Sequence, residues 1–452
     1  MSDIILRQVG LPGGGTTDIG ISGGLLADPD RLQPGDQIDA SGLILLPGLV
    51  DLHTHLREPD ADPAETIASG TAAAARGGFT AVFAMANTNP VTDSAARVRG
   101  IQARSQSSSA EVVPIGAISQ GLAGLELADI VGMHQAGVTV FSDDGHCLMN
   151  SQLMEQALYQ VGQFHGVIAE HCQDHDLASA RAWRPTGGQQ SAEQLSTQPM
   201  ADPFPTISGG DEDWPRSAEA VMVARDIQLA QATGSHIHLC HLSTAESVDL
   251  VRWAKSRDLP VTAEVTPHHL LLDHSMVMSG DTTFKVNPPL RDIEDRLALR
   301  QALADGIIDI VGTDHAPHRA LDKTLPINRA KPGMIGLEYA LAVVIETMVL
   351  PGLIDWPILI ERMSVTPAKI GGIADHQGRP VMIGEPANLT LIDPTRRQQV
   401  DRNDSLSLGR NNPYHGLDLP DPVMATWLNG RLTWQHEALT DRRAGGPRAD
   451  GS

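Results

Sequence analysis

The stretch Asp51-Leu-His-Thr-His-Leu-Arg-Glu-Pro59 decides the fold and points to the chemistry. It continues an apolar run that begins at Leu43, and one residue separates its two histidines, His53 and His55. Side chains alternate between the faces of a strand, so both imidazoles point to the same side. Two imidazoles on one face supply half of a metal site, although a lone H-x-H is more often a pair of structural histidines. A metal is favoured here because further histidines and aspartates end later apolar runs.

Composition and charge exclude several classes of protein. The chain has 452 residues, 41% of them hydrophobic, which is enough for one large core and a smaller second one. Its formal net charge of −22 argues against a surface for nucleic acid or an anionic membrane, because those contacts need clustered lysine and arginine. No apolar run approaches the roughly 20 residues that cross a bilayer, and the opening residues lack a signal-peptide pattern. We expect a soluble, cytoplasmic protein.

The cysteines are three in number, Cys147, Cys172 and Cys240, and none of them has C-x-x-C spacing. An odd count without that spacing argues against a disulfide framework. We expect three free, buried thiols that pack as small apolar side chains.

The middle of the chain, residues 49–373, alternates apolar runs of strand length with amphipathic stretches of helical length. This alternation is typical of βα units around a parallel sheet. Strands are expected at 49–55, 79–85, 111–118, 138–142, 166–171, 236–242, 261–266 and 307–313. Helices are expected at Glu65–Arg76, Leu122–Ala136, Ser151–Phe164, Ser217–Thr233, Thr244–Ser256 and Arg291–Ala304. Eight strands close a TIM-type (β/α)8 barrel, and an open doubly wound sheet is the alternative.

The two ends of the chain have a different texture. Residues 1–48 contain short alternating runs broken by glycine and proline, which suits antiparallel strands. Short strands return at Pro380–Met382, Asn388–Ile392, Val423–Leu428 and Arg431–Trp434. We expect residues 1–48 and 374–440 to combine into a small β-sandwich domain beside the barrel.

Two segments lack any regular pattern. Residues 173–216 are rich in Gln, Ser, Pro and Gly and are far longer than a usual βα loop, so we expect a lid or a mobile surface there. Residues 441–452 are rich in Arg, Gly and Asp and are expected to be a disordered tail.

Candidate metal ligands stand at the ends of the expected strands, where the active sites of such barrels lie. They are His53, His55, Asp143, Asp144, His171, His241 and Asp314. In the sixth strand His236 and His238 compete with His241, whose position at the strand end favours it. Four imidazoles with two carboxylates exceed what one tetrahedral zinc uses, so two metals that share a bridging group are expected.

The bridging group must be a carboxylate. A carbamylated lysine often bridges the metals of such barrels, but the first lysine of this chain is Lys255, beyond the candidate strands up to the sixth. Asp143 and Asp144 are both placed to bridge.

Four more polar residues follow the same strand ends: Arg57, Asn87, Asn287 and His318. A guanidinium beside cationic metals suits a substrate with a carboxylate, which arginine binds through two parallel hydrogen bonds. Alternatively, Arg57 forms a surface ion pair with Glu58 or Glu65.

The assembled motifs resemble those of dihydroorotases, in particular the bacterial class I type of the amidohydrolase superfamily. The resemblance spans nearly the whole chain and is carried by DLHTHLREPD, MANTNPVTD, FSDDG, AEHCQD, HLCHLSTAESV, AEVTPHHL, KVNPPLR, GTDHAPH, KPGMIGLE, GEPANLTLID and NNPYHG. LREP together with TDHAPH is the most specific combination.

This resemblance implies a zinc centre of one or two ions, with two favoured, held by His53, His55, Asp144, His171, His241 and Asp314. It implies that Arg57, Asn87 and His318 bind the substrate carboxylate. It also implies that Asn287 and the backbone of Pro332 and Gly333 hold the ring.

The implied activity is the reversible cyclisation of N-carbamoyl-L-aspartate to L-dihydroorotate in pyrimidine biosynthesis. A metal-activated hydroxide attacks the ring amide carbonyl, and Asp314 carries the proton to the departing nitrogen. The expected partners are this small-molecule substrate, further copies of the chain in a homo-oligomer and, as an option, aspartate carbamoyltransferase. The alternatives are another cyclic-amide hydrolase, a hydantoinase or allantoinase, and a non-catalytic subunit that scaffolds the carbamoyltransferase.

Overall fold

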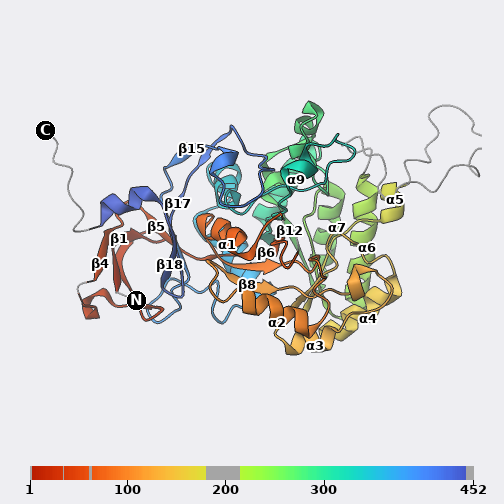
Figure 1. Ribbon diagram of the computed structural model, residues 1–452, viewed down its shortest axis with the longest axis horizontal. Coiled ribbons are helices and arrows are strands. Elements are labelled where there is room, and N and C mark those ends of the chain that lie inside the picture. Colours follow the sequence, from red (N-terminus) through yellow and green to blue (C-terminus); the bar gives the residue numbers. More distant parts are fainter. Residues whose placement is uncertain (1–2, 34, 61–63, 180–213, 444–452) are drawn as a thin grey trace, which may run out of the picture.

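The structure is a computed structural model that describes residues 3–33, 35–60, 64–179 and 214–443 (Figure 1). A ring of parallel strands surrounded by helices lies beside a mostly antiparallel sheet made from both ends of the chain. The expected tail at 441–452 and the expected lid at 173–216 fall mainly on residues outside those ranges. None of the described helices is long and apolar enough to cross a membrane.

Eight parallel strands form the barrel. They are β6 (Leu49–Thr54), β7 (Phe79–Ala84), β8 (Glu111–Pro114), β9 (Val140–Phe141), β10 (Val167–Glu170), β11 (His236–Leu239), β12 (Val261–Val265) and β13 (Ile310–Val311). Ladders connect β6 to β8 and β9 to β13. Single parallel bridges, Gly116 to Phe141 and Thr54 to His315, join these two groups. Because the second bridge connects the first strand to the end of the eighth, the barrel prediction is confirmed and the open sheet is wrong.

Helices cover the outside of this ring (Figure 1). Their bounds are α1 (Ile67–Arg76), α2 (Ala95–Arg104), α3 (Ile130–Gln135), α4 (Ser151–Gly162), α5 (His175–Ser179), α6 (Arg216–Thr233), α7 (Ala245–Lys255), α8 (Pro267–Leu271), α9 (Ile293–Asp305), α10 (Ala320–Lys323), α11 (Ala340–Val344), α12 (Trp356–Ile360) and α13 (Thr366–Ile370). Short π-helical turns follow α11 at Ile345–Val349 and α12 at Glu361–Val365. Threonines define two of the starts: Thr66 before α1 and Thr244 before α7 each accept a backbone N–H of the first turn.

The predicted helix Leu122–Ala136 is wrong in its first half. Leu122 and Gly124 adopt positive φ angles, which a continuous helix does not allow. The helix begins only at Ile130, where the Asp129 side chain accepts the backbone N–H of Gly132. Helix α2 was not anticipated.

The two chain ends share one eight-stranded sheet. Its strands are β1 (Ile4–Gly10), β2 (Thr16–Ser22), β3 (Leu25–Ala27), β4 (Asp36–Asp39), β5 (Ile44–Pro47), β14 (Leu389–Ile392), β17 (Val423–Leu428) and β18 (Arg431–Gln435). β5 pairs antiparallel with β14, which joins the N-terminal strands to the C-terminal ones. We propose that this sheet, with residues 1–48 and 374–440, forms a domain beside the barrel of residues 49–373.

Two details of the C-terminal segment differ from expectation. The expected strand Pro380–Met382 is wrong, because the Met382 N–H donates to Pro380 O at 2.9 Å and closes a turn. A two-stranded ladder of β15 (Arg397–Gln399) with β16 (Asp418–Pro420) was not anticipated.

The three cysteines are free and buried, as predicted.

Candidate metal centre

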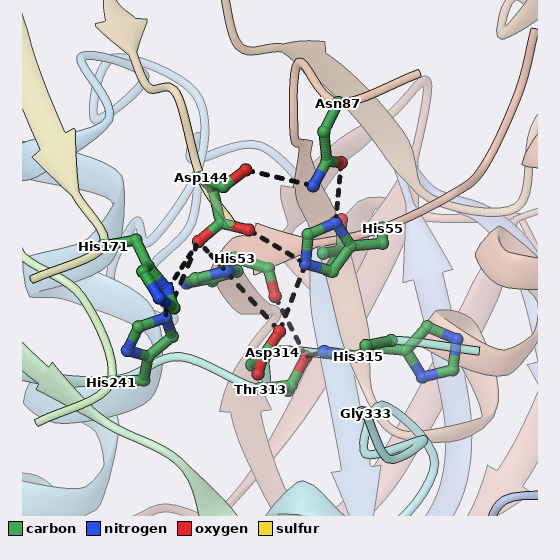
Figure 2. Close-up of polar contacts among 12 residues, drawn as sticks. His53, His55, Asn87, Asp144, His171, His241, Thr313, Asp314, His315 and Gly333 are labelled. Atoms are coloured by element: carbon green, nitrogen blue, oxygen red, sulfur yellow. Dashed lines mark hydrogen bonds and ion pairs between the residues drawn. The ribbon is translucent and has the colours of Figure 1, made fainter. Parts of the chain in front are cut away.

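Six side chains meet at the end of the barrel where the strands finish (Figure 2). They are the residues that sequence reasoning selected: His53, His55, Asp144, His171, His241 and Asp314. Each has at most 5% of its surface exposed. The His53 Nε2 atom lies 3.4 Å from Asp144 Oδ1 and 3.6 Å from Asp314 Oδ1. The His55 Nε2 atom lies 3.3 Å from Asp144 Oδ2 and 3.2 Å from Asp314 Oδ1.

Asp144 lies between the two sides of this cluster (Figure 2). Its Oδ1 atom is 3.6 Å from both His171 Nδ1 and His241 Nε2, whereas its Oδ2 atom faces His55. One carboxylate therefore contacts His55, directly after β6, through Oδ2, and His53 of β6 with the histidines that follow β10 and β11 through Oδ1. A bridging ligand needs this arrangement.

Asp143, the other aspartate considered for the bridge, points elsewhere. Its Oδ1 atom accepts the backbone N–H groups of Ile118 and Ser119 at 2.7 and 3.0 Å, and its Oδ2 atom accepts the Ser119 hydroxyl. These bonds occupy the carboxylate in the loop after β8. The geometry therefore favours Asp144 over Asp143 as the bridging group.

The cluster fits a divalent cation. The His53 Nε2 and Asp144 Oδ1 atoms are buried and have no hydrogen-bond partner among the described residues, which is costly unless a ligand satisfies them. His171 Nδ1 and His241 Nε2 face each other at only 2.9 Å. Three overlapping groups of described residues, His53–His55–Asp314, His53–Asp144–His241 and His53–Cys240–Glu264, each gather their potential ligand atoms within 4.8 Å. Imidazole nitrogens with carboxylate oxygens are the donors that zinc and similar ions use.

Both carboxylates are ionised in this environment. Burial acts to raise the pKa of Asp144, but the neighbouring imidazoles of His53, His171 and His241 hold that pKa well below its ordinary value. Burial also acts on Asp314, where His55 and His53 outweigh it and lower the pKa. Two buried negative charges among four imidazoles form a site that attracts cations.

The remaining histidines near the cluster have other partners or directions. His315 points away from the six side chains (Figure 2), and its Nε2 atom contacts Glu65 Oε2 at 3.3 Å. His238 and His236, which competed with His241, contact the Thr262 hydroxyl at 2.9 and 2.8 Å. Neither belongs to the groups that bring potential ligand atoms together.

Two other histidines lie on α8. The His269 Nδ1 atom contacts the Thr266 hydroxyl at 2.8 Å. His268 is buried with both ring nitrogens unsatisfied by protein atoms.

Arg57 and His318 lie beside the cluster on the rim. Arg57 donates to the carbonyl of Pro317 at 3.4 Å, and no ion pair within the described ranges joins it to Glu58 or Glu65. The ion pair considered as an alternative is therefore not formed. The His318 Nε2 atom donates to Pro332 O at 2.7 Å. Burial, with nearby Arg57, holds the pKa of His318 well below its ordinary value, so this imidazole is neutral.

Gly333 leaves space for the imidazole of His318 to pack against the loop that contains Gly333. Its φ angle is +141°, and a Cβ atom there would lie 2.7 Å from His318 Nε2. Any side chain at this position would therefore push the imidazole away, in addition to straining the backbone. The backbone carbonyl of Gly333 accepts a hydrogen bond from Asn411 Nδ2 at 3.0 Å.

The two predicted asparagines contact metal-ligand candidates directly. The His55 Nδ1 atom donates to Asn87 Oδ1 at 2.9 Å, which turns His55 Nε2 toward the cluster (Figure 2). Asn287 forms two reciprocal bonds of 2.8 and 3.0 Å with the amide of Gln173. Its Nδ2 atom also lies 3.4 Å from His171 Nε2.

Sequence reasoning missed three residues that support this site: Gln173, Glu264 and Asn411. Asn411 donates to Ala316 O and Gly333 O, at 2.9 and 3.0 Å, and its Oδ1 atom accepts the His318 N–H at 3.1 Å. A residue from the C-terminal segment therefore holds the rim loop. For Asn411 the sequence signal was the motif NNPYHG, which does not predict these contacts.

Comparison with known proteins assigns the family. The Dihydro-orotase-like family model matches residues 42–247. A dihydroorotase of Streptomyces coelicolor is 49% identical over 446 residues, covering 97% of this chain and 100% of the relative. A dihydroorotase of Mycobacterium leprae is 46% identical, covering 95% of this chain and 98% of the relative.

Solved structures agree with the fold. An L-hydantoinase from Arthrobacter aurescens superposes with a TM-score of 0.81 at 24% identity, covering 96% of both chains. A D-hydantoinase from a Bacillus species gives a TM-score of 0.81 at 20% identity, covering 96% of this chain and 95% of the other. At these identities the likeness is one of fold alone, whereas the curated relatives match along nearly their full length. The chain belongs to the dihydroorotase family.

Proposed function

We propose that this protein is a dihydroorotase, which interconverts N-carbamoyl-L-aspartate and L-dihydroorotate, and that it does so with zinc. The observation that carries the proposal is the meeting of four imidazoles and two carboxylates at one barrel end, with Arg57 beside them. The family relationship supports the substrate, because relatives of nearly the same length are named dihydroorotase.

Two zinc ions suit the donor set better than one. Six donors exceed a tetrahedral shell, and Asp144 contacts His55 through Oδ2 and both His53 and His171 through Oδ1. His53, His55 and Asp314 would hold one ion, and His171 with His241 would hold the other. When bound, zinc acts as a Lewis acid that makes water a nucleophile near a pH of about 7.

The proton path is assigned to Asp314. It is ionised and buried among the imidazoles, so it can accept a proton. In the hydrolytic direction the oxygen of water adds to the ring amide carbonyl carbon, and the carbon–nitrogen bond breaks. Asp314 takes the proton of that water and delivers it to the departing nitrogen, which balances the reaction.

The rim residues would hold the substrate. Arg57 supplies a guanidinium for the carboxylate, and the neutral His318 and Asn87 supply further polar contacts. Asn287, with the backbone of Pro332 and Gly333, would contact the ring. Asn87 and Asn287 already bond to His55 and Gln173, so part of their role is to orient neighbouring side chains.

The assembly and location are also proposals. We expect a cytoplasmic homo-oligomer, and association with aspartate carbamoyltransferase is a further option. Six intact ligand candidates argue against a silent scaffold subunit.

Turnover tests the proposal. Purified protein should hydrolyse L-dihydroorotate, lose that activity after removal of metal with a chelator, and regain it when Zn²⁺ is added. Hydantoin and allantoin serve as substrates for the alternative function, and we expect little turnover of either. The proposal fails if metal-replete protein, alone and with its carbamoyltransferase, does not act on dihydroorotate, or if hydantoin or allantoin is the better substrate.

A further inference from the structure

Glu264 is a fully buried carboxylate below the cluster. It lies on β12, the seventh strand of the barrel, and is 0% exposed. Burying an ionised carboxylate is costly unless several donors satisfy it. The donors that surround Glu264 indicate what it does.

The first donor is the ring of His53. The His53 Nδ1 atom lies 2.5 Å from Glu264 Oε1, a short and charge-assisted hydrogen bond. A neutral imidazole that donates from Nδ1 has its lone pair on Nε2. That Nε2 atom faces Asp144 and Asp314 in the cluster. Glu264 therefore selects the tautomer and the ring orientation that a metal at Nε2 requires.

The second donor is the backbone of His241. Its N–H group donates to the same oxygen, Glu264 Oε1, at 3.1 Å. His241 adopts a φ angle of +34°, which is unfavourable for a residue with a side chain. The hydrogen bond helps to hold that conformation, and the conformation directs the imidazole of His241 toward His171.

The other oxygen of Glu264, Oε2, accepts a hydrogen bond from His238. The His238 Nε2 atom donates to Glu264 Oε2 at 3.2 Å, and the Thr262 hydroxyl donates to His238 Nδ1 at 2.9 Å. His236 Nε2 completes the chain by donating to Thr262 Oγ1 at 2.8 Å. This assignment gives each ring nitrogen and the hydroxyl a consistent role as donor or acceptor. Both oxygens of the Glu264 carboxylate therefore accept hydrogen bonds.

The eighth strand leaves room for this carboxylate at Gly312. A Cβ atom at that position would lie 2.2 Å from Glu264 Oε2 and 2.6 Å from its Cδ atom. Because hydrogen bonds hold Glu264 on both oxygens, it could not move aside at low cost. The glycine of GTDHAPH therefore makes space for Glu264.

We propose that Glu264 is a positioning residue for the metal centre, which orients the imidazole of His53 and the backbone of His241 through one oxygen. This inference rests on the proposed metal function. Glu264 also lies with His53 and Cys240 in a group of potential ligand atoms. The inference assigns Glu264 no metal bond, because its Oε1 atom accepts the hydrogen bond of His53 Nδ1 at 2.5 Å.

The test compares metal binding by wild type, Glu264→Gln and a matched control, Glu338→Gln. Glu338 is also a buried carboxylate, paired with Arg76 at 3.1 Å and bonded to the backbone N–H of Leu406, but it contacts none of the six ligand candidates. The Zn²⁺ dissociation constant is measured by competition with a chromophoric chelator, and the Co²⁺-loaded proteins are compared by visible absorption. Thermal unfolding of the metal-free proteins reports stability separately.

We expect Glu264→Gln to bind Zn²⁺ about 10- to 100-fold more weakly than wild type, as is typical when a partner of a metal-bound histidine is lost. Its Co²⁺ spectrum should also change. Glu338→Gln should lower stability while keeping the wild-type affinity and spectrum. Equal affinity in wild type and Glu264→Gln, or an equal loss in both variants, would overturn the proposal. Failure of wild type itself to bind zinc would instead reject the metal function.

A second measurement applies if Glu264→Gln does not fold. In a crystal structure of zinc-loaded wild type, zinc should bind Nε2 of His53, with the hydrogen bond from Nδ1 to Glu264 retained. Zinc bound to His53 Nδ1 or to Glu264 would overturn the proposal.

Discussion

Asp314 Oδ1 lies 3.2 Å from His55 Nε2, although 259 positions of chain separate the two residues. The contact joins the end of the first barrel strand to the end of the eighth and places an ionised carboxylate among the imidazoles. This position is why we assign the proton transfer to Asp314.

Asp314→Asn should remove the proton acceptor while keeping the shape of the side chain. We expect kcat for dihydroorotate hydrolysis to fall by about 10²- to 10⁴-fold, the usual effect of losing a general acid–base group. Because Asp314 is also a ligand candidate, zinc content must be measured in the same sample. A variant with full zinc and an unchanged kcat would remove Asp314 from the proton path.

Arg57→Ala should weaken substrate binding more than turnover. The guanidinium is half-buried, interacts electrostatically with Asp314 and Asp144, and is available to a substrate carboxylate. Losing a hydrogen bond to a charged group costs about 1.5–3 kcal/mol, so KM should rise about 10- to 100-fold. Arg57→Lys keeps the positive charge but loses the two parallel hydrogen bonds of the guanidinium. Its KM should therefore lie between those of wild type and Arg57→Ala. An unchanged KM in Arg57→Ala would assign carboxylate binding to other residues.

Gly333→Ala should displace His318. The added Cβ atom would lie 2.7 Å from His318 Nε2, in a backbone conformation that strains any side chain. We expect a lower kcat/KM for dihydroorotate. Gly352→Ala is the matched control, because Gly352 also has a positive φ, +76°, but nothing lies within 4 Å of its Cβ position. Comparable losses of kcat/KM in both variants would show that strain alone, without His318, explains the effect.

His376 should contribute to stability in a pH-dependent way. Its Nε2 atom contacts Glu111 at 3.0 Å, and this contact outweighs burial and raises the pKa of His376. A raised folded-state pKa stabilises the fold below the ordinary histidine pKa of about 6.5, and that contribution is lost as pH rises through the folded-state pKa. Since the side chain is 38% exposed, the effect should stay below about 1 kcal/mol.

Thermal unfolding of wild type and His376→Asn, measured from below the ordinary histidine pKa to above the folded-state pKa of His376, checks the prediction. The difference in Tm should be largest at the acidic end and disappear at the alkaline end. Glu111→Gln should reduce the same pH dependence, with Asp375 supplying the remainder. A difference that grows with pH would contradict the assigned sign.

The sequence predicted the barrel and the six ligand candidates because both depend on local patterns. Strand-length apolar runs located the strands, and polar residues at their ends located the rim, since strand ends meet in any such barrel. The choice between Asp143 and Asp144 needed contacts from the loop after β8: Ser119 and Ile118 donate to Asp143, and neither is near it in the chain.

Local sequence patterns could not predict the roles of Glu264 and Asn411 or the interruption of one helix. Glu264 lies inside a strand, where alternation says only that it faces the barrel interior, and its role depends on histidines of two other strands. Asn411 reaches the rim from the segment after β15. The break in the helix expected at Leu122–Ala136 arises from Leu122 and Gly124, whose positive φ angles a hydrophobic pattern does not reveal.

Anomalous diffraction from zinc-loaded crystals, recorded at the zinc absorption edge, tests the central claim most directly. The account predicts two peaks within about 2.0–2.2 Å of the nitrogens and oxygens of His53, His55, Asp144, His171, His241 and Asp314, with Asp144 between them. Zinc bound elsewhere on the protein, with these six side chains free of metal, would contradict it.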